Sequence, residues 1–386
     1  MNTPALVDLS PTAWLMLKGV LLAVLPLWWV WRRQPHATPM QRLRLLTVVT
    51  LFLTFDLVLF GAFTRLTDSG LGCPDWPGCY GAASPLGAHA DISAAQAAMP
   101  SGPVTFPKAW VEMIHRYLAT GVGVLIMVLA WLTWRQRRHL PVSPLWPALT
   151  LVWVCVQGAF GALTVTMKLF PAIVTLHLLF GLGLLALLRV QAVQYARADQ
   201  AWPMVALPRA SVWALWGVFA LLWVQIALGG WVSTNYAVLA CTEFPTCQGS
   251  WWPPMDVATG FQWWRELGMD RSGAAIPFAA LTAIHMVHRA FAVLVIVALC
   301  WAAWRLWRAD PALRPQARWL ALGAAWQLGS GLSNVVLDWP LLAAVAHTGG
   351  AAALVVGFTG ALLSVQGRAT PRPQHPPISS TTGRPA

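Results

Sequence analysis

Charged and imidazole side chains interrupt two apolar runs of this sequence at matching places. The stretch Glu112–Arg116 places a carboxylate, an imidazole and a guanidinium at the opening of one run. His285–Arg289 opens another run, with a histidine where the first has an acid. Charged groups cost at least a few kcal/mol each inside a bilayer, so they are expected where they face a protein interior and serve a function. The two stretches therefore predict two buried sites.

Four histidines are expected near one level of the membrane: His115, His177, His288 and His347. Each follows the start of an apolar run by a few residues (about five for His115), which places it within roughly two helical turns of the outer surface. Two imidazoles on different helices at equal depth are what bis-histidine haem ligation needs. A lone intramembrane histidine is more often a hydrogen-bond partner between helices, but two matched pairs favour ligation. We expect His115 with His177 to serve one haem, and His288 with His347 the other.

The residues beside these histidines admit more than one role. Arg116 and Arg289 each follow a predicted ligand, where a guanidinium could bind a haem propionate or close a helix contact with a backbone carbonyl. Glu112 lies one turn before His115 on the same helix face, and its counterpart is His285. An acid beside only one haem predicts unequal tasks. One haem would carry electrons, and Glu112 would move protons or stabilise a developing cation at the other.

Two cysteine pairs share a spacing of six: Cys73 with Cys79, and Cys241 with Cys247. Both pairs lie in predicted outer loops, where an oxidising compartment would favour disulfides, each contributing about 2 kcal/mol by closing a small ring. Zinc ligation by the four thiolates is the alternative, which the lack of a CxxC spacing disfavours. Cys155 and Cys300 lie within apolar runs and are expected to be packing residues.

The composition indicates an integral membrane protein. Of the 386 residues, 58% are apolar and 10% are charged. Nine apolar runs are long enough to cross a hydrocarbon core of about 30 Å. They are 13–31, 44–64, 110–134, 145–167, 171–190, 211–232, 276–304, 317–337 and 341–364. Asp56, in the second run, is a further buried acid, expected either to pair with a threonine or arginine or to take part in the chemistry.

Arginine placement predicts the orientation. The arginines cluster in alternate connections between the runs, which assigns those connections to the cytoplasm. The net charge of +12 then reflects topology and not nucleic-acid binding. The first run lacks the small-residue cleavage site of an export signal and is expected to be a retained helix. The histidines and cysteine loops would then face the periplasm of a bacterial inner membrane.

The eight runs after the first form two similar sets of four. Landmarks recur about 170 residues apart: Gly61, Cys73, His115, Gln157, Gly161 and His177, then Gly229, Cys241, His288, Gln327, Gly331 and His347. We therefore predict an all-α integral membrane fold with two duplicated four-helix transmembrane bundles in parallel orientation, 44–200 and 201–367. An extra N-terminal transmembrane helix and cytoplasmic linker would occupy 1–43, and a disordered cytoplasmic tail 368–386.

These motifs together resemble the haem A synthase family, over nearly the whole chain from about 44 to 364. The resemblance rests on Gly61-x-x-Thr64-Arg65-Leu66-Thr67-x-Ser69-Gly70-Leu71, Glu112-x-x-His115-Arg116, Gln157 through Thr164-Val165, His177, Gly230-Trp231-Val232-Ser233-Thr234-Asn235, His288-Arg289 and His347. The cysteine pairs are similar to those of the cysteine-containing branch of that family. The first helix departs from its usual eight-helix pattern.

The resemblance implies an enzyme that oxidises the C8 methyl group of haem O to the formyl group of haem A, for cytochrome oxidase. It implies that His288 and His347 hold a permanent haem b and that His115 and His177 face the substrate haem O. It also implies that Glu112 is essential. Membrane lipid, haem O synthase, cytochrome oxidase assembly factors and a second copy of the chain are the partners that would fit.

Two other functions are compatible with the same residues. A bis-histidine di-haem b electron carrier, linked to quinol, would hold two b haems tightly and form no modified porphyrin. A non-catalytic transporter or assembly factor would use the duplication as a two-lobed pore and would bind no pigment through His288. The porphyrins bound to the purified protein separate the three functions.

Overall fold

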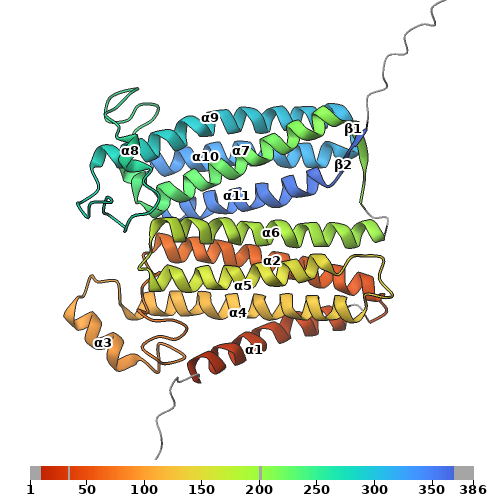
Figure 1. Ribbon diagram of the computed structural model, residues 1–386, viewed down its shortest axis with the longest axis horizontal. Helices are drawn as coiled ribbons and strands as arrows, with labels where there is room; N and C mark the ends of the chain where they lie inside the picture. The colour runs from red at the N-terminus through yellow and green to blue at the C-terminus, as the bar shows by residue number, and fades with distance from the viewer. Residues whose placement is uncertain (1–9, 34, 200–201, 369–386) are drawn as a thin grey trace, which may run out of the picture.

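The computed structural model describes residues 10–33, 35–199 and 202–368. Within these ranges the chain is mostly helical, and its long helices lie side by side with the larger loops gathered at one end (Figure 1). Eight of the described helices are long and apolar enough to cross a membrane. The predicted class, an all-α integral membrane protein, is confirmed.

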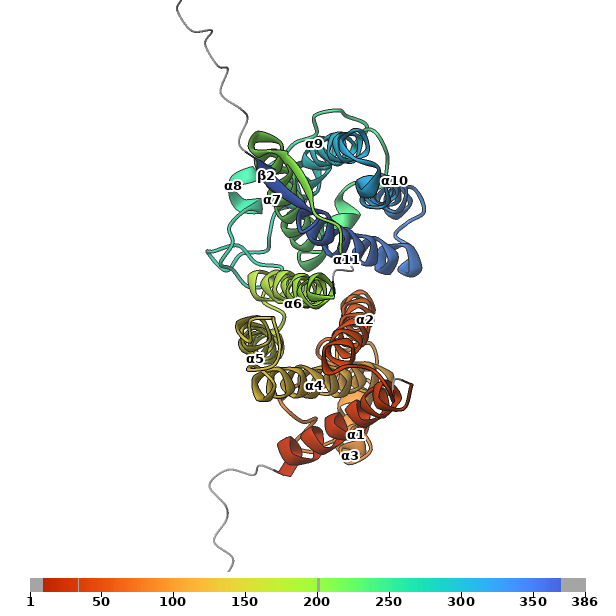
Figure 2. The same cartoon turned by 90° about the vertical axis from the view of Figure 1, so that its right-hand side faces the viewer.

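The first part of the chain forms α1 (Ser10–Arg33), α2 (Pro39–Leu66), α3 (His89–Ala98), α4 (Phe106–Arg135), α5 (Leu145–Thr166) and α6 (Pro171–Ala198). Local sequence starts these helices: Thr38 and Gln41 form a capping box ahead of α2, and the Thr105 side chain caps α4. Helices α2, α4, α5 and α6 pack in a ring, and α1 lies outside it against α4 and α2 (Figure 2).

The second part forms β1 (Val205–Pro208), α7 (Arg209–Thr234), η1 (Ala237–Ala240), α8 (Val257–Gly260), α9 (Phe278–Ala309), η2 (Pro311–Leu313), α10 (Arg314–Val336), α11 (Leu341–Leu362) and β2 (Val365–Arg368). Helices α7, α9, α10 and α11 pack in a second ring. The short parallel pair β1–β2, with Val205 opposite Val365, was not predicted. Arg368, assigned to the tail, ends β2, and residues 369–386 of that tail lie outside the described residues.

Of the nine runs predicted to cross the membrane, eight form helices that are apolar enough to span it, and the run 317–337 is the exception. It forms α10 at the expected place, but α10 is not among the eight helices that are apolar enough to span. The reason lies in its sequence, because Gln327, Ser330 and Ser333 interrupt the apolar run. The side chains of Gln327 and Ser330 make hydrogen bonds to His347 of α11, so their polarity serves the interior of the second bundle.

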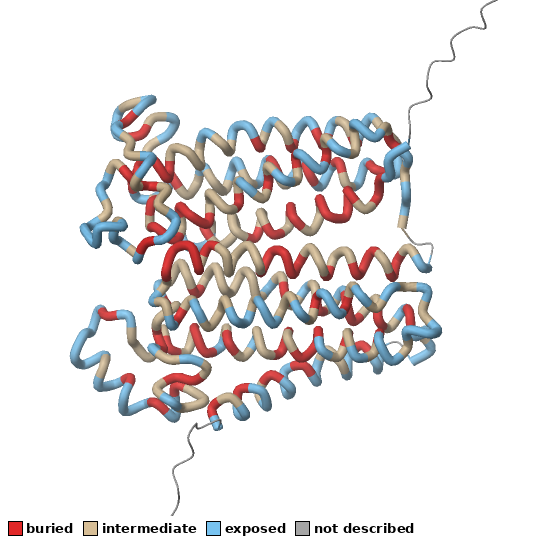
Figure 3. The backbone as a smooth tube through the Cα atoms, in the orientation of Figure 1, coloured by how far each residue is buried: buried red, intermediate tan, exposed pale blue. Residues whose placement is uncertain are grey.

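Helix α6 joins the two bundles because it is apolar on more than one face. Leu182 and Leu185 belong to the core of the second bundle, whereas Leu184 and Leu188 pack against α4 in the first. Figure 3 shows buried residues concentrated along α6 and α11, at the boundary between the bundles. The boundary is therefore continuous apolar packing, which fixes the bundles relative to each other.

Candidate functional site

His115 lies deeper in its helix than residue counting suggested, whereas the other three histidines lie about where it placed them. His115 is the tenth residue of α4 and His288 the eleventh of α9, whereas His177 and His347 are the seventh residues of α6 and α11. The estimate for His115 was wrong because α4 begins at Phe106, ahead of the apolar run, where Thr105 caps it. All four still lie in the half of their helix nearest the larger loops (Figure 1).

The structure brings the histidines together in the two expected pairs. The rings of His115 and His177 are close enough to interact electrostatically, and so are those of His288 and His347. All four histidines are half-buried, so each keeps some accessible surface although it lies in a packed helix. Each bundle thus presents two imidazoles from different helices to one space.

A glycine on a neighbouring helix lies against each imidazole. A Cβ atom added at Gly61 would lie 3.0 Å from Nε2 of His115, and one at Gly229 would lie 3.0 Å from Cε1 of His288. The corresponding distance to Cε1 is 3.3 Å from Gly161 to His177, and 3.2 Å from Gly331 to His347. Because glycine has no side chain, these four positions provide the space that the imidazole rings occupy. This explains why the glycines recur in both halves.

One turn before two of these glycines, a glutamine braces the histidine helix. Nε2 of Gln157 donates to the backbone carbonyl of His177 at 3.1 Å, and Nε2 of Gln327 donates to that of His347 at 2.9 Å. Gln157 and Gly161 lie on α5, so one face of α5 both holds α6 and leaves space for its imidazole. The sequence landmarks of the duplication are therefore contacts to the histidines.

The two bundles differ in what lies at Nδ1 of each imidazole. Ser330 Oγ lies 2.9 Å from Nδ1 of His347 and donates its own hydrogen to the carbonyl of Trp326 at 2.7 Å. Because that hydroxyl has one hydrogen, Nδ1 of His347 must donate to Ser330, which leaves the lone pair of Nε2 free. At His288, the side-chain amide of Gln225 lies 3.1 Å from Nδ1. Sequence reasoning missed both partners, although the position of Ser330 beside a landmark glycine was a usable signal.

Among the described residues, no side chain makes a hydrogen bond to a ring nitrogen of His115 or His177 in the first bundle. Nδ1 of His177 is buried without a hydrogen-bond partner in the part of the chain that the structure describes. By the 170-residue offset, the counterpart of Ser330 is Phe160, which has no polar side chain. The ring of Phe60 stacks on His115, with centroids 6.3 Å apart. The imidazoles of the first pair thus have no side-chain hydrogen bond among the described residues, whereas each imidazole of the second pair has one.

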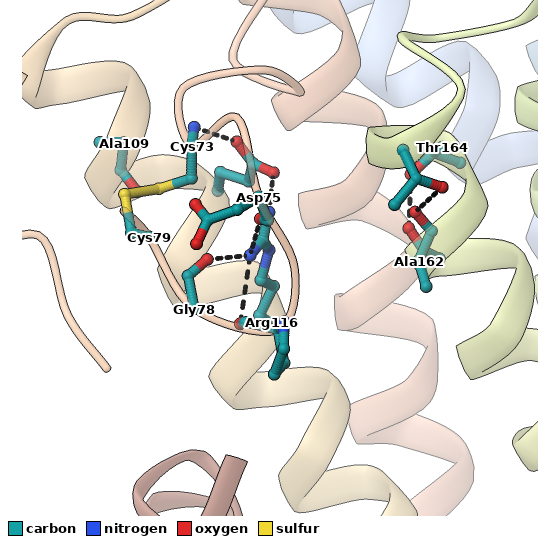
Figure 4. Close-up of polar contacts among 12 residues, drawn as sticks. Cys73, Asp75, Gly78, Cys79, Ala109, Arg116, Ala162 and Thr164 are labelled. Atoms are coloured by element: carbon teal, nitrogen blue, oxygen red, sulfur yellow. Dashed lines mark hydrogen bonds and ion pairs between the residues drawn. A yellow bond between two sulfur atoms is a disulfide. The ribbon is translucent and has the colours of Figure 1, made fainter. Parts of the chain in front are cut away.

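Glu112 and Arg116 hold the first cysteine loop, and Figure 4 shows Arg116 pointing at the carbonyl groups of that loop. They form a buried ion pair, and Oε2 of Glu112 accepts the amide hydrogen of Cys73 at 2.8 Å. Nη1 of Arg116 donates to the carbonyls of Asp75, at 3.0 Å, and Gly78, at 2.5 Å. Arg116 therefore closes a contact with loop carbonyls, and these contacts give no support to the predicted propionate role.

The second cysteine loop is held in the same way by His285 and Arg289. Nδ1 of His285 donates to the carbonyl of Ala237 at 3.0 Å, and its Nε2 accepts from Nε of Arg289 at 3.2 Å. The remaining nitrogens of Arg289 donate to the carbonyls of Thr246, at 3.1 Å, and Cys241, at 3.2 Å. His285 thus replaces Glu112 as partner of the arginine, and both of its ring nitrogens are occupied.

Both predicted disulfides are present, Cys73–Cys79 and Cys241–Cys247. The four cysteines are at most 1% exposed. The zinc alternative has no support, because the described residues contain no cluster of three or more metal-ligating side chains. Cys155 and Cys300 are exposed on their helices, so their assignment as packing residues was wrong. A run that is apolar all round does not reveal which face is buried.

The predicted pairing of Asp56 was also wrong. Asp56 is exposed on α2, and its carboxylate makes no hydrogen bond or ion pair among the described residues. The threonines nearby on α2 turn back on their own helix, as Thr54 does in donating to the carbonyl of Thr50 at 2.7 Å. They are therefore not available to the acid.

The residues present fit a pair of haems. Each bundle supplies two half-buried histidines, and each imidazole lies against a glycine that keeps bulk away from it. At His347 the hydrogen bonds select the tautomer whose Nε2 can bind iron, as metal-ligating histidines require. The donor set is that of bis-histidine haem ligation.

Comparison with known proteins agrees with this chemistry. The family model described as "Cytochrome oxidase assembly protein" matches residues 44–359. A haem A synthase of Shewanella oneidensis is 37% identical over 308 residues, which cover 80% of this chain and 92% of that protein. Haem A synthases of Halalkalibacterium halodurans (26% identity, 52% of this chain, 62% of that protein) and Shouchella clausii (27%, 55% and 65%) are more distant. The chain belongs to the cytochrome oxidase assembly protein family that these haem A synthases exemplify.

Proposed function

We propose that this protein is a haem A synthase, an enzyme that oxidises the C8 methyl group of haem O to the formyl group of haem A. The second bundle, through His288 and His347, would hold a permanent haem b. The first bundle, through His115 and His177, would bind haem O. The observation that carries this division is the side-chain partner of Nδ1, which His347 has in Ser330 and His177 lacks among the described residues.

A permanent haem needs ligands that dissociate slowly from the iron. The bond from Nδ1 of His347 to Ser330 fixes the ring plane and raises the basicity of Nε2, which strengthens a bond to iron. The side-chain amide of Gln225 donates to the ring of His288 and limits its rotation, but here the imidazole accepts the hydrogen bond, in contrast to His347. When bound there, haem b supplies one-electron transfer.

A substrate haem must instead enter and leave. His177 lacks a partner at Nδ1 among the described residues, so rotation of its ring breaks no side-chain hydrogen bond. Such a ring can release iron at lower cost than one held on both sides. Haem O carries an apolar farnesyl tail, and the first bundle lies among membrane-spanning helices, which fits entry from the lipid.

Glu112 supports this site from the loop side. With Arg116 it holds the Cys73–Cys79 ring above the helix that carries His115. Both of its oxygens are engaged, so proton transfer by Glu112 would need the ion pair or the bond to Cys73 to open. We propose that Glu112 is essential first because it closes this loop over the substrate, and that it handles protons when the loop moves.

We further propose a location in a bacterial inner membrane with the histidine end toward the periplasm. The larger loops with their disulfides lie at that end, where an oxidising compartment would favour the bridges. Arginines such as Arg197 and Arg305 lie toward the opposite ends of their helices, as expected for the cytoplasmic side.

The test is the porphyrin that cells make with this protein. Membranes of a host that produces haem O but no haem A should contain haem A after expression of this chain. A His177→Ala variant should leave haem O unconverted, and its purified form should keep the haem b spectrum. A chain that holds two b haems and leaves haem O unchanged is instead a di-haem electron carrier, the second candidate that four matched histidines allow.

A further inference from the structure

A group of unpartnered polar atoms lies at the end of the α6–α11 boundary opposite the histidines. They are Nε of Arg189 and of Arg197, Nε1 of Trp202 and Oγ1 of Thr359, all buried and without a hydrogen bond among the described residues. Buried donors of this kind are rare in native proteins, because each one lost without a partner costs about 1–3 kcal/mol. Several together therefore point to a partner outside the described residues.

The arginines lie along the boundary between the two bundles. The guanidinium carbon of Arg189 lies 4.8 Å from the ring centroid of Trp202. On the other side, a Cβ atom added at Gly360 of α11 would lie only 2.7 Å from Nη2 of Arg189. The guanidinium is thus held between an indole and a bare stretch of helix. Arg197 is anchored nearby, where its Nη2 donates to the carbonyl of Leu363.

No carboxylate neutralises these arginines in the part of the chain that the structure describes. The ion pairs found there join Arg65 to Asp68 and Arg116 to Glu112, both at the histidine end. Arg189 also makes no hydrogen bond to a described residue, although its side chain is half-buried on a membrane-spanning helix. A charge desolvated to this extent without a counter-ion is strongly unfavourable.

The depth of Arg189 indicates what the counter-ion is. From the first residue of α6, Pro171, to Arg189 is about 27 Å at 1.5 Å per residue. The hydrocarbon core is about 30 Å thick, so Arg189 lies near its far edge, at the level where lipid phosphates begin. Guanidinium groups bind phosphate oxygens in bidentate fashion, and basic pockets between membrane helices bind anionic headgroups.

We infer that Arg189 and Arg197, with Trp202 and Thr359, form a binding site for the phosphate group of an anionic membrane lipid. The lipid would lie at the boundary between the two bundles and join α6 to α11. Inorganic phosphate shares the chemistry, and the depth of the site favours the lipid. The site is independent of the haems and of the proposed enzymatic function.

The experiment measures lipid retained by the full-length protein in native mass spectrometry after purification in mild detergent. The wild type should keep a phosphatidylglycerol or cardiolipin adduct. In Arg189→Met the fraction of protein that carries this adduct should fall at least tenfold. Arg318→Met is the matched control, because Arg318 is exposed and also lies over a tryptophan, Trp307, at 5.3 Å. It should retain the adduct. Equal retention by Arg189→Met and the wild type would overturn the proposal.

A second measurement covers a variant that does not fold. Delipidated wild-type protein should show a higher unfolding temperature with added phosphatidylglycerol, and no rise with a neutral diacylglycerol. Thr359→Val, which removes one hydroxyl group, should weaken the response about threefold. A response of the wild type to both lipids alike would overturn the site. If millimolar inorganic phosphate displaced the adduct and stabilised the protein equally, free phosphate would replace lipid as the ligand.

Discussion

Side-chain hydrogen bonds to the ring nitrogens divide the four histidines into two kinds. His347 donates to Ser330, and His288 lies beside the amide of Gln225, whereas Nδ1 of His177 has no described partner. Such second contacts typically change metal affinity by about 10–100-fold. A duplicated scaffold can therefore hold one haem permanently and exchange another without any change in the ligands themselves.

Removing the hydroxyl of Ser330 should loosen the permanent haem. We expect Ser330→Ala to weaken retention of haem b by about tenfold, because His347 loses the acceptor for its Nδ1 hydrogen. The measurement is the rate of haem transfer from purified protein to apomyoglobin. Ser333→Ala is the control, since Ser333 donates to a backbone carbonyl and not to His347. Equal transfer rates for Ser330→Ala and the wild type would show that the hydrogen bond does not secure the haem.

Glu112 offers a test that separates loop closure from proton transfer. Glu112→Ala should leave haem O, or an alcohol intermediate, in place of haem A. Glu112→Gln keeps an acceptor for the Cys73 amide but loses the ion pair with Arg116. It should restore part of the product if loop closure dominates.

The assay extracts haems from membranes and separates them by chromatography. Glu243→Ala serves as the control, because Glu243 accepts the Gly249 amide hydrogen in the other cysteine loop. Normal haem A in Glu112→Ala would remove Glu112 from the account of the reaction.

At the scale of helices, glycine positions decide how close a neighbouring helix can come to each imidazole. Gly229 on α7 lies against His288, whereas Gly217 on the same helix has no neighbour within 4 Å of an added Cβ atom. The same contrast holds on α5, where Gly158 is open and Gly161 faces His177. Two glycines of one helix thus have different physical roles, which allows matched substitutions.

We expect Gly229→Ala to displace the His288 ring and to lower the haem b content at least fivefold. An added Cβ atom would lie 3.0 Å from Cε1 of His288, closer than most carbon contacts. Gly217→Ala should keep full haem content and be slightly more stable, by about 0.5–1 kcal/mol, because alanine favours helices. The ratio of Soret absorbance to protein reports the result. A normal ratio in Gly229→Ala would mean that the His288 ring tolerates an added Cβ atom and does not need this glycine.

Helix α1 gives the first cysteine loop a support that the second lacks. Nζ of Lys18 donates to the carbonyl of Ala83 at 2.7 Å and to the hydroxyl of Tyr117 at 3.2 Å. Leu15 packs with Cys73 and Cys79 in one apolar cluster. The extra helix therefore covers the loop that Glu112 and Arg116 hold from the other side.

Lys18→Met should loosen that loop. Cys73 and Cys79 are both fully buried, so a reductant reaches their disulfide only when the loop opens. We expect reduction and maleimide labelling of this pair to speed up about threefold or more. Cys241–Cys247 provides the internal control, because α1 packs against α4 and α2 of the first bundle, on the side away from the second bundle (Figure 1). Acceleration of both pairs to the same extent would indicate general destabilisation instead.

The sequence predicted helices, disulfides and the grouping of the histidines better than it predicted contacts. Four histidines, two disulfides and most helix positions were found from residue types and spacing, because apolar runs and repeated landmarks survive without coordinates. The partners of Arg116 and the exposure of Asp56 were not. The partners of Arg116 depend on how the cysteine loop folds back, and the exposure of Asp56 depends on which face of an apolar helix is buried. Neither produces a periodic pattern in the sequence. Helix starts differed because a cap residue can lie ahead of the apolar run, as Thr105 does.

At the scale of the whole molecule, equivalent residues of the two halves meet at the boundary. Nη2 of Arg65 donates to the carbonyl of Ser233 at 2.6 Å, and the hydroxyl of Tyr236 donates to Asp68 at 2.5 Å. Both pairs are separated by 168 residues. Such self-matching contacts are what a twofold axis between duplicated halves produces. Burial raises the pKa of Tyr236, so its phenol remains a donor near neutral pH.

This symmetry makes the chemical difference between the halves the central claim. Two bundles of the same architecture would hold haems of different permanence, through different contacts behind the same imidazoles. The difference should persist when the substrate is withheld, since it belongs to the protein. Haem b should also be lost from the second bundle when its histidine ligands are removed.

The most direct measurement is the haem content of protein purified from a host that lacks haem O. We predict one haem b per chain in the wild type and in His177→Ala, and none in His347→Ala. Binding of added haem O by the wild type should then be reversible. Two equally tight haems in the wild type, or haem b retained by His347→Ala and lost from His177→Ala, would contradict the account.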